Sequence, residues 1–254
     1  YFAFFNQVTG FDISADGSTL AISSDRVGFA DVQAGMNDIY MYNLREQTMK
    51  RISTDLYDDT DPMFVGNSNE MLIFSSNRIA DSLNVAVGNF QTIGDNYDLF
   101  YYNPQESPNK LVRLTNTPQK ELQPSYFDER TVLYLSGKTG INNLYSLDLI
   151  SKESKQVTNS RQGIKKYGFS ANTKDFIFRA WQKRKDRMFL KRNFDFAKNE
   201  KAVLTPRLEY LQQKGLTEPE SQEQPNEETP KEVKTDTIPQ RPYDPNVIDT
   251  DDYQ

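Results

Sequence analysis

The chain has 254 residues, of which 36% are hydrophobic and 26% are charged, and its formal net charge is −6. Its 16 phenylalanines, 14 tyrosines and one tryptophan supply enough apolar surface for one sizeable core. The absence of cysteine and histidine excludes a disulfide framework, a thiolate metal site and any Ser-His or Cys-His nucleophile pair within these residues. We therefore expect no cofactor and no metal ion.

The N-terminal part holds the clearest copy of a repeated pattern. Residues 14–26 read Ser-Ala-Asp-Gly-Ser-Thr-Leu-Ala-Ile-Ser-Ser-Asp-Arg, residues 38–44 read Asp-Ile-Tyr-Met-Tyr-Asn-Leu, and residues 50–54 read Lys-Arg-Ile-Ser-Thr. The first stretch looks like the aspartate box of sialidases, but it lacks the residue that the box requires between Asp16 and Gly17. We predict a plain turn between two strands there.

Three further copies follow along the chain, and the fourth is the most degraded. Short aromatic and apolar runs alternate with turn clusters, which indicates strands joined by hairpins. Corresponding strands recur after 60, 45 and 44 residues, a spacing that suits four-stranded propeller blades with one insertion. The matching segments are 71–78, 98–104 and 111–115 in the second copy, 132–138, 143–149 and 155–158 in the third, and 176–179, 187–191 and 201–205 in the fourth.

These repeats predict an all-β fold, a β-propeller built of four-stranded antiparallel blades. We expect residues 1–7 to end a preceding blade, residues upstream of Tyr1 to complete the ring, and the chain to be a fragment of a longer protein. The last stretch, 206–254, has 12 acidic and 5 basic residues and seven of the 12 prolines, so we expect a linker or docking tail with little helix beyond Leu208–Lys214. The four predicted blades are 8–54, 61–117, 124–160 and 167–205.

The repeat resembles that of TolB-like propellers (the PD40 type), also found in the tricorn protease and related peptidases. The resemblance covers residues 8–205 and rests on Ser-Ala-Asp-Gly, Ser-Ser-Asp-Arg, Asp-Ile-Tyr-Met-Tyr and Lys-Arg-Ile-Ser. It departs from the pattern in the fourth copy, where Arg179-Ala-Trp-Gln replaces the Ser-x-x-Arg ending. Such a resemblance implies the fold, whereas function has to come from the site.

Insertions gather on one face of the predicted propeller. If the strands of a blade are called a to d, the b–c loops and the loops joining d to the next a share one face. The extra residues of the first two blades, 27–37 and 79–97, lie between b and c. Insertions on one face of a repeat protein mark its binding side. We predict that the partner-binding residues, there and on the basic hairpin of the fourth blade, are Asp55, Tyr57, Asp58, Asp59, Phe90, Tyr97, Trp181, Arg184 and Arg187.

Other interpretations of these residues are weaker. The aspartates between Asp55 and Asp61 could ligate calcium, but the spacing matches no EF-hand loop, so we expect a solvated acidic loop. The basic stretch 179–192 could bind nucleic acid, but it straddles a hairpin and favours a charged turn or an acidic partner. Arg26 and Arg78 recur at the end of strand b, so we expect them to hydrogen-bond neighbouring loops.

We predict a non-catalytic protein-interaction scaffold of a bacterial cell-envelope assembly, because the TolB-like resemblance implies binding to other envelope proteins. The same resemblance implies an exported protein, periplasmic or associated with the outer membrane or cell surface. No apolar run reaches the roughly 18 residues that span a bilayer. Two alternatives remain open: the propeller domain of a larger hydrolase whose catalytic domain lies outside these residues, and a glycan-binding propeller that uses aromatic loops. No Gly-x-Ser-x-Gly elbow is present.

Overall fold

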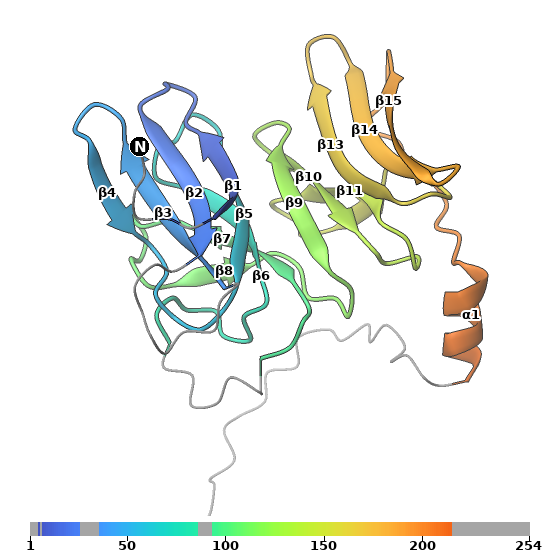
Figure 1. Ribbon diagram of the computed structural model, residues 1–254, viewed down its shortest axis with the longest axis horizontal. Coiled ribbons are helices and arrows are strands. Elements are labelled where there is room, and N and C mark those ends of the chain that lie inside the picture. The colour runs from blue at the N-terminus through green and yellow to red at the C-terminus, as the bar shows by residue number, and fades with distance from the viewer. Residues whose placement is uncertain (1–4, 6, 26–35, 86–92, 215–254) are drawn as a thin grey trace, which may run out of the picture. The chain divides into compact units, whose positions relative to one another are not determined.

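The computed structural model describes residues 5, 7–25, 36–85 and 93–214, and within them the chain forms four antiparallel sheets in chain order (Figure 1). The first sheet contains β1 (Val8–Ile13), β2 (Thr19–Asp25), β3 (Asn37–Asn43) and β4 (Thr48–Arg51). The second contains β5 (Asp59–Phe64), β6 (Leu72–Ser76), β7 (Asp98–Tyr102) and β8 (Leu111–Arg113). The third contains β9 (Glu121–Tyr126), β10 (Thr131–Ser136), β11 (Asn143–Asp148) and β12 (Ser154–Gln156), and the fourth contains β13 (Ile164–Ser170), β14 (Asp175–Gln182) and β15 (Lys185–Lys191).

The apolar core lies between neighbouring sheets. One cluster joins Ala21 and Ile39 of the first sheet to Phe74 and Phe100 of the second. A second cluster joins the second and third sheets, and a third joins the third and fourth. Neighbouring blades bury their facing sides against each other, which is how propeller blades gain stability that none has alone. The prediction of an all-β propeller with four blades is confirmed.

The first three blades share one hydrogen bond near the start of strand c, the third strand of each blade. The backbone N–H of Ile39 donates to Ser53 Oγ (2.9 Å), and Leu99 and Leu144 donate in the same way to Thr115 Oγ1 and Thr158 Oγ1 (2.8 and 2.9 Å). A small hydroxyl residue after strand d thus fastens strand c in three blades.

The residue just before this donor differs between blades, and its partner differs with it. Asp38 pairs with Arg51 and Asp98 with Arg113, each cation lying on strand d. In the third blade the acid is replaced by Asn143, and the position of the arginine is taken by Gln156. Charge at this position is therefore balanced within each of the first three blades, as burial of these groups requires.

The fourth blade differs from the prediction, because residues 201–205 do not form its outer strand. After β15 the chain places Phe194 and Phe196 in an aromatic cluster with Phe127 and Phe176, between the third and fourth sheets. The following segment then bonds to the third blade: Glu200 N–H donates to the carbonyl of Gln156 (2.7 Å). Burial of the two phenylalanines draws the chain away from β15, and the fourth sheet has three strands within the described ranges.

The predicted turn at Ser14–Thr19 is confirmed. Asp16 accepts hydrogen bonds from Ser14 Oγ (2.6 Å) and from the N–H of Ser18 (3.0 Å), while Gly17 has a φ of 68°. The hydrogen bonds from Ser14 and Ser18 lower the pKa of Asp16 to about 2.

The helix α1 (Pro206–Gln213) follows the blades, close to the predicted helix at Leu208–Lys214. Thr205 caps it through a hydrogen bond from Leu208 N–H. In the part of the chain with described coordinates, no helix has the length and apolar character needed to cross a bilayer. Most of the predicted tail, 215–254, and most of the predicted entry strand, 1–7, lie outside the described residues.

Candidate functional site

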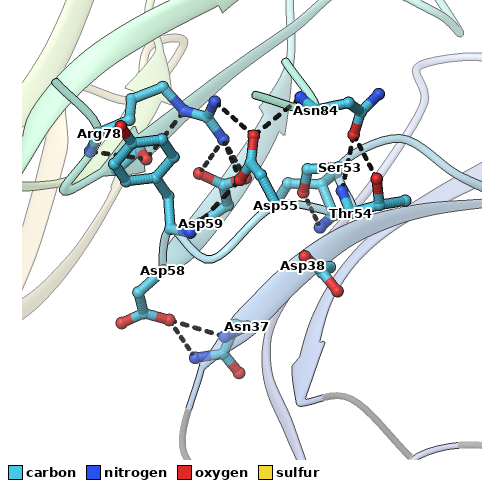
Figure 2. Close-up of polar contacts among 12 residues, drawn as sticks. Asn37, Asp38, Ser53, Thr54, Asp55, Asp58, Asp59, Arg78 and Asn84 are labelled. Carbon is cyan, nitrogen blue, oxygen red and sulfur yellow. Dashed lines mark hydrogen bonds and ion pairs between the residues drawn. The ribbon is translucent and has the colours of Figure 1, made fainter. Parts of the chain in front are cut away.

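The connection between the first two blades carries most of the predicted partner-binding residues, and a buried guanidinium organises it (Figure 2). Arg78 follows β6 and is 2% exposed. Its Nη1 lies 3.1 Å from Asp55 Oδ2, and its Nη2 lies 2.6 Å from Asp59 Oδ2. Two carboxylates thus face one cation, and all three side chains are fully buried.

The remaining donors of Arg78 are also satisfied. Nε donates to Ser76 Oγ (3.1 Å), and Nη1 donates to the carbonyl of Ser82 (2.8 Å). The guanidinium lies 5.0 Å from the ring centroid of Tyr57, within cation–π range. Buried charge is tolerated here because nearly every polar atom has a partner.

The same cluster holds the loop that follows Arg78. Asp55 Oδ2 accepts from Asn84 N–H (2.8 Å), and Asn84 Oδ1 in turn accepts from Thr54 N–H and Thr54 Oγ1 (2.8 and 2.7 Å), as Figure 2 shows. The prediction that Arg78 bonds to neighbouring loops is confirmed, whereas Arg26 lies outside the described residues.

The prediction of a solvated acidic loop is wrong for Asp55 and Asp59, because both are buried against Arg78. Tyr57 is buried as well, with 1% of its surface exposed. These three residues therefore form the support under the surface and do not present a contact surface to a partner. The guanidinium of Arg78 lies between the two carboxylates and supplies the positive charge that a bound metal ion would otherwise supply. The described residues contain no group of three potential metal ligands.

Asp58 points away from this cluster and joins the two loops that carry the insertions. Its Oδ1 accepts from both the backbone N–H and Nδ2 of Asn37 (2.8 Å each), at the end of the first insertion. Its other oxygen accepts from the hydroxyl of Tyr97, at the end of the second. Burial and the hydrogen bond to Asp58 raise the pKa of Tyr97, so the hydroxyl stays protonated as the donor. Phe90, also predicted here, lies outside the described residues.

The predicted residues of the fourth blade lie elsewhere, on the β14–β15 hairpin. Trp181 is 51% exposed and packs under Lys165, whose Nζ lies 4.9 Å from the ring centroid. Arg184 lies in the two-residue turn with a φ of 62°, and Arg187 is exposed on β15. The structure thus divides the predicted site into the junction of the first two blades and this basic hairpin.

Glu121 is a residue that the sequence did not single out. It begins β9 opposite Ser136, as Asp59 begins β5 opposite Ser76. Its Oε1 accepts from Thr117 Oγ1 (2.9 Å) and Ser136 Oγ (3.0 Å), while Oε2 has no hydrogen-bond partner among the described residues. Burial raises the pKa of Glu121 to about 7. The signal was the repeat itself, which aligns this glutamate with Asp59.

Replacing Glu121 with glutamine is expected to flatten the pH dependence of stability. The folded state binds the carboxyl proton of Glu121 more tightly than the unfolded state does, because in the unfolded state this carboxyl has a pKa near 4.5. The contribution of protonated Glu121 to the free energy of unfolding is thus fully present below pH 4.5 and is lost as the pH rises through about 7. The free energy of unfolding changes by roughly 3 kcal/mol over this range. Urea unfolding between pH 4 and 8 measures the difference between variant and wild type. Glu129→Gln, in an exposed turn, should keep the wild-type profile, and an unchanged decline in Glu121→Gln would contradict the assignment.

Solved structures with the same fold include proteins with different roles. A putative TolB from Agrobacterium tumefaciens is 18% identical with a TM-score of 0.55, covering 75% of this chain and 64% of that one. TolB from Acinetobacter baumannii is 14% identical with a TM-score of 0.52 (73% and 41% covered). The tricorn protease is 16% identical with a TM-score of 0.51 (75% and 22% covered).

At these identities the likeness shows the fold alone, and it confirms the TolB-like and tricorn-like propeller expected from the repeats. The chain spans less than two thirds of the length of each of these proteins. No family model and no curated protein sequence matches it.

Proposed function

We propose that the chain is a non-catalytic interaction module of a bacterial cell-envelope assembly and is exported from the cytoplasm. It binds protein partners through its top loops, which are the b–c loops and the loops that join one blade to the next. The observation that carries this proposal is the rigid junction of the first two blades. Arg78, Asp55 and Asp58 fasten the loop ends with buried or half-buried bonds. Loops held in place before binding lose less conformational entropy when a partner docks.

The chemistry of the chain supports a binding role over catalysis. The carboxylates of Asp55 and Asp59 are engaged by Arg78, so neither is positioned as a general acid or base. The sequence lacks histidine and cysteine throughout. The fold likeness to TolB proteins supports the envelope setting.

A second candidate is the propeller domain of a larger peptidase, and the fold likeness to the tricorn protease favours it. The two candidates differ in where activity resides. The interaction module predicts partners that contact the top loops of this chain, whereas the peptidase domain predicts peptide hydrolysis by the longer protein that contains it.

Photo-crosslinking at two exposed isoleucines tests the proposed function. Ile79 lies in a top loop of the second blade and is 67% exposed, while Ile150 lies in a c–d turn of the third blade and is 77% exposed. A photoreactive residue at position 79 is expected to capture a discrete envelope protein in cells of the source bacterium, and the same residue at position 150 is expected to capture none. Equal capture from both positions, or none from position 79, would contradict binding through the top loops.

A further inference from the structure

Among the described residues, no strand pairs with the outer edge of β15 in the fourth blade, whereas each of the other three blades has a fourth strand there. β15 pairs with β14 on one side, and the chain beyond it bonds to the third blade. The turn at Lys183 and Arg184 has two residues, which places Gln182 opposite Lys185 as the hydrogen-bonded closing pair. Because the bonding alternates along an antiparallel ladder, the backbone groups of Asp186, Met188 and Leu190 point away from β14.

A cavity lies beside this edge. It has a volume of about 600 Å³ and is walled by Phe178, Phe189 and Phe194. In the second blade, β8 covers the corresponding surface by pairing Leu111 with Tyr102. The repeat alignment matches Tyr102 to Lys191, and Lys191 lines the cavity, so the cavity occupies the place that a fourth strand covers elsewhere.

The two sides of β15 have different chemistry. Lys185, Arg187, Phe189 and Lys191 alternate onto the side that faces the cavity, where Arg161 and the Lys198–Glu200 ion pair also lie. Met188 and Leu190 lie on the opposite side, 72% and 54% exposed, together with Asp186, which pairs with Lys165. Both acids are paired with lysines, so a strand added to this edge would set one row of its side chains against a side with excess positive charge and the other against Met188 and Leu190.

We propose that β15 binds an extended segment of a protein partner, with alternating acidic and apolar residues, as the fourth strand of the fourth blade. Backbone hydrogen bonds to Met188 and its outward neighbours would hold the segment, and the alternation would select it. This inference rests on the proposed interaction function and names the partner chemistry at the second half of the site, where Trp181, Arg184 and Arg187 lie. Unpaired strand edges readily accept such segments.

The test uses the full chain and an end-blocked eight-residue peptide of alternating valine and glutamate, with fluorescence anisotropy as the readout. Met188→Pro removes an outward N–H, and proline is tolerated at an edge position that faces solvent. We expect Met188→Pro to weaken binding at least tenfold relative to Met188→Ala, which keeps the N–H. A valine–lysine peptide should bind at least tenfold more weakly than the valine–glutamate peptide.

Several outcomes would overturn the proposal. They are no binding by the wild-type chain up to millimolar peptide, equal binding by the two Met188 variants, or equal binding of the two peptides. Hydrogen exchange at Asp186, Met188 and Leu190 identifies other occupants. Protection that rises with protein concentration would assign the edge to a second copy, and protection independent of concentration without peptide would assign it to the same chain. If crosslinking at position 79 succeeds while the peptide fails, this inference falls and the proposed function stands.

Discussion

Replacement of Arg78 by alanine is expected to lower the free energy of unfolding by about 3–5 kcal/mol, because it leaves Asp55 and Asp59 buried without their cation. Urea denaturation followed by intrinsic fluorescence measures the loss. The same change should loosen the loop that contains Ser82 and Asn84. The carbonyl of Ser82 accepts a hydrogen bond from Arg78, and the N–H of Asn84 donates one to Asp55. Faster amide exchange at Asn84 would report that release.

The matched control is Arg130→Ala, which removes a cation with 62% of its side chain exposed from an ion pair with Asp148. Exposed ion pairs contribute little, so this variant should lose less than about 1 kcal/mol. A triple variant, Arg78→Met with Asp55→Asn and Asp59→Asn, should recover much of the loss because no charge stays buried unpaired. If Arg78→Ala unfolds within about 1 kcal/mol of the wild type, the cluster is not the support that we assign to it.

Phe176→Ala is expected to destabilise the fourth blade by about 3–5 kcal/mol. The ring is fully buried and contacts the rings of Phe178, Phe194 and Phe196 at centroid distances of 5.2, 4.8 and 5.9 Å. Its loss opens a cavity in the cluster that holds β13–β15 to the third blade. It also removes the apolar surface that draws the chain at Phe194 and Phe196 away from β15.

The neighbouring residue provides the control for this variant. Ile177 lies next to Phe176 on β14 but points to the opposite face and is 38% exposed. Ile177→Ala should cost about 1 kcal/mol or less, since it creates no enclosed cavity. Chemical denaturation of both variants under one condition measures the contrast, and equal losses would contradict the placement of the Phe176 aromatic cluster between the third and fourth sheets.

Local sequence predicted the first three blades well for a physical reason. A strand such as Leu72–Ser76 is recognisable from its β-branched and aromatic residues between turn signals. Each blade repeats the same order of strands and turns within about 45–60 residues. The Asp16–Gly17 turn was equally legible, because its hydrogen bonds join residues only a few positions apart.

The fourth blade shows where such a prediction fails. Residues 201–205 carry the apolar and hydroxyl residues of an outer strand. They do not pair with β15, because Phe194 and Phe196 are buried in the aromatic cluster between the blades and direct the chain there. The cluster includes Phe127 and Phe169, which lie far back along the chain. Competition between a local strand signal and a distant core is invisible in a window of a few residues.

The sequence by itself determined the fold class, the number of blades within these residues, the absence of thiol and imidazole chemistry, and the structural role of the arginine after strand b. Only the tertiary structure decided which aspartates meet that arginine: Asp55 and Asp59 lie 23 and 19 positions from Arg78, and their burial reverses the solvated loop expected from their charge. It alone also showed that no described strand covers the outer edge of β15 and that Glu121 is buried. Repeats and composition act locally, whereas burial, ion pairing and strand pairing depend on which distant segments the packing of blades brings together.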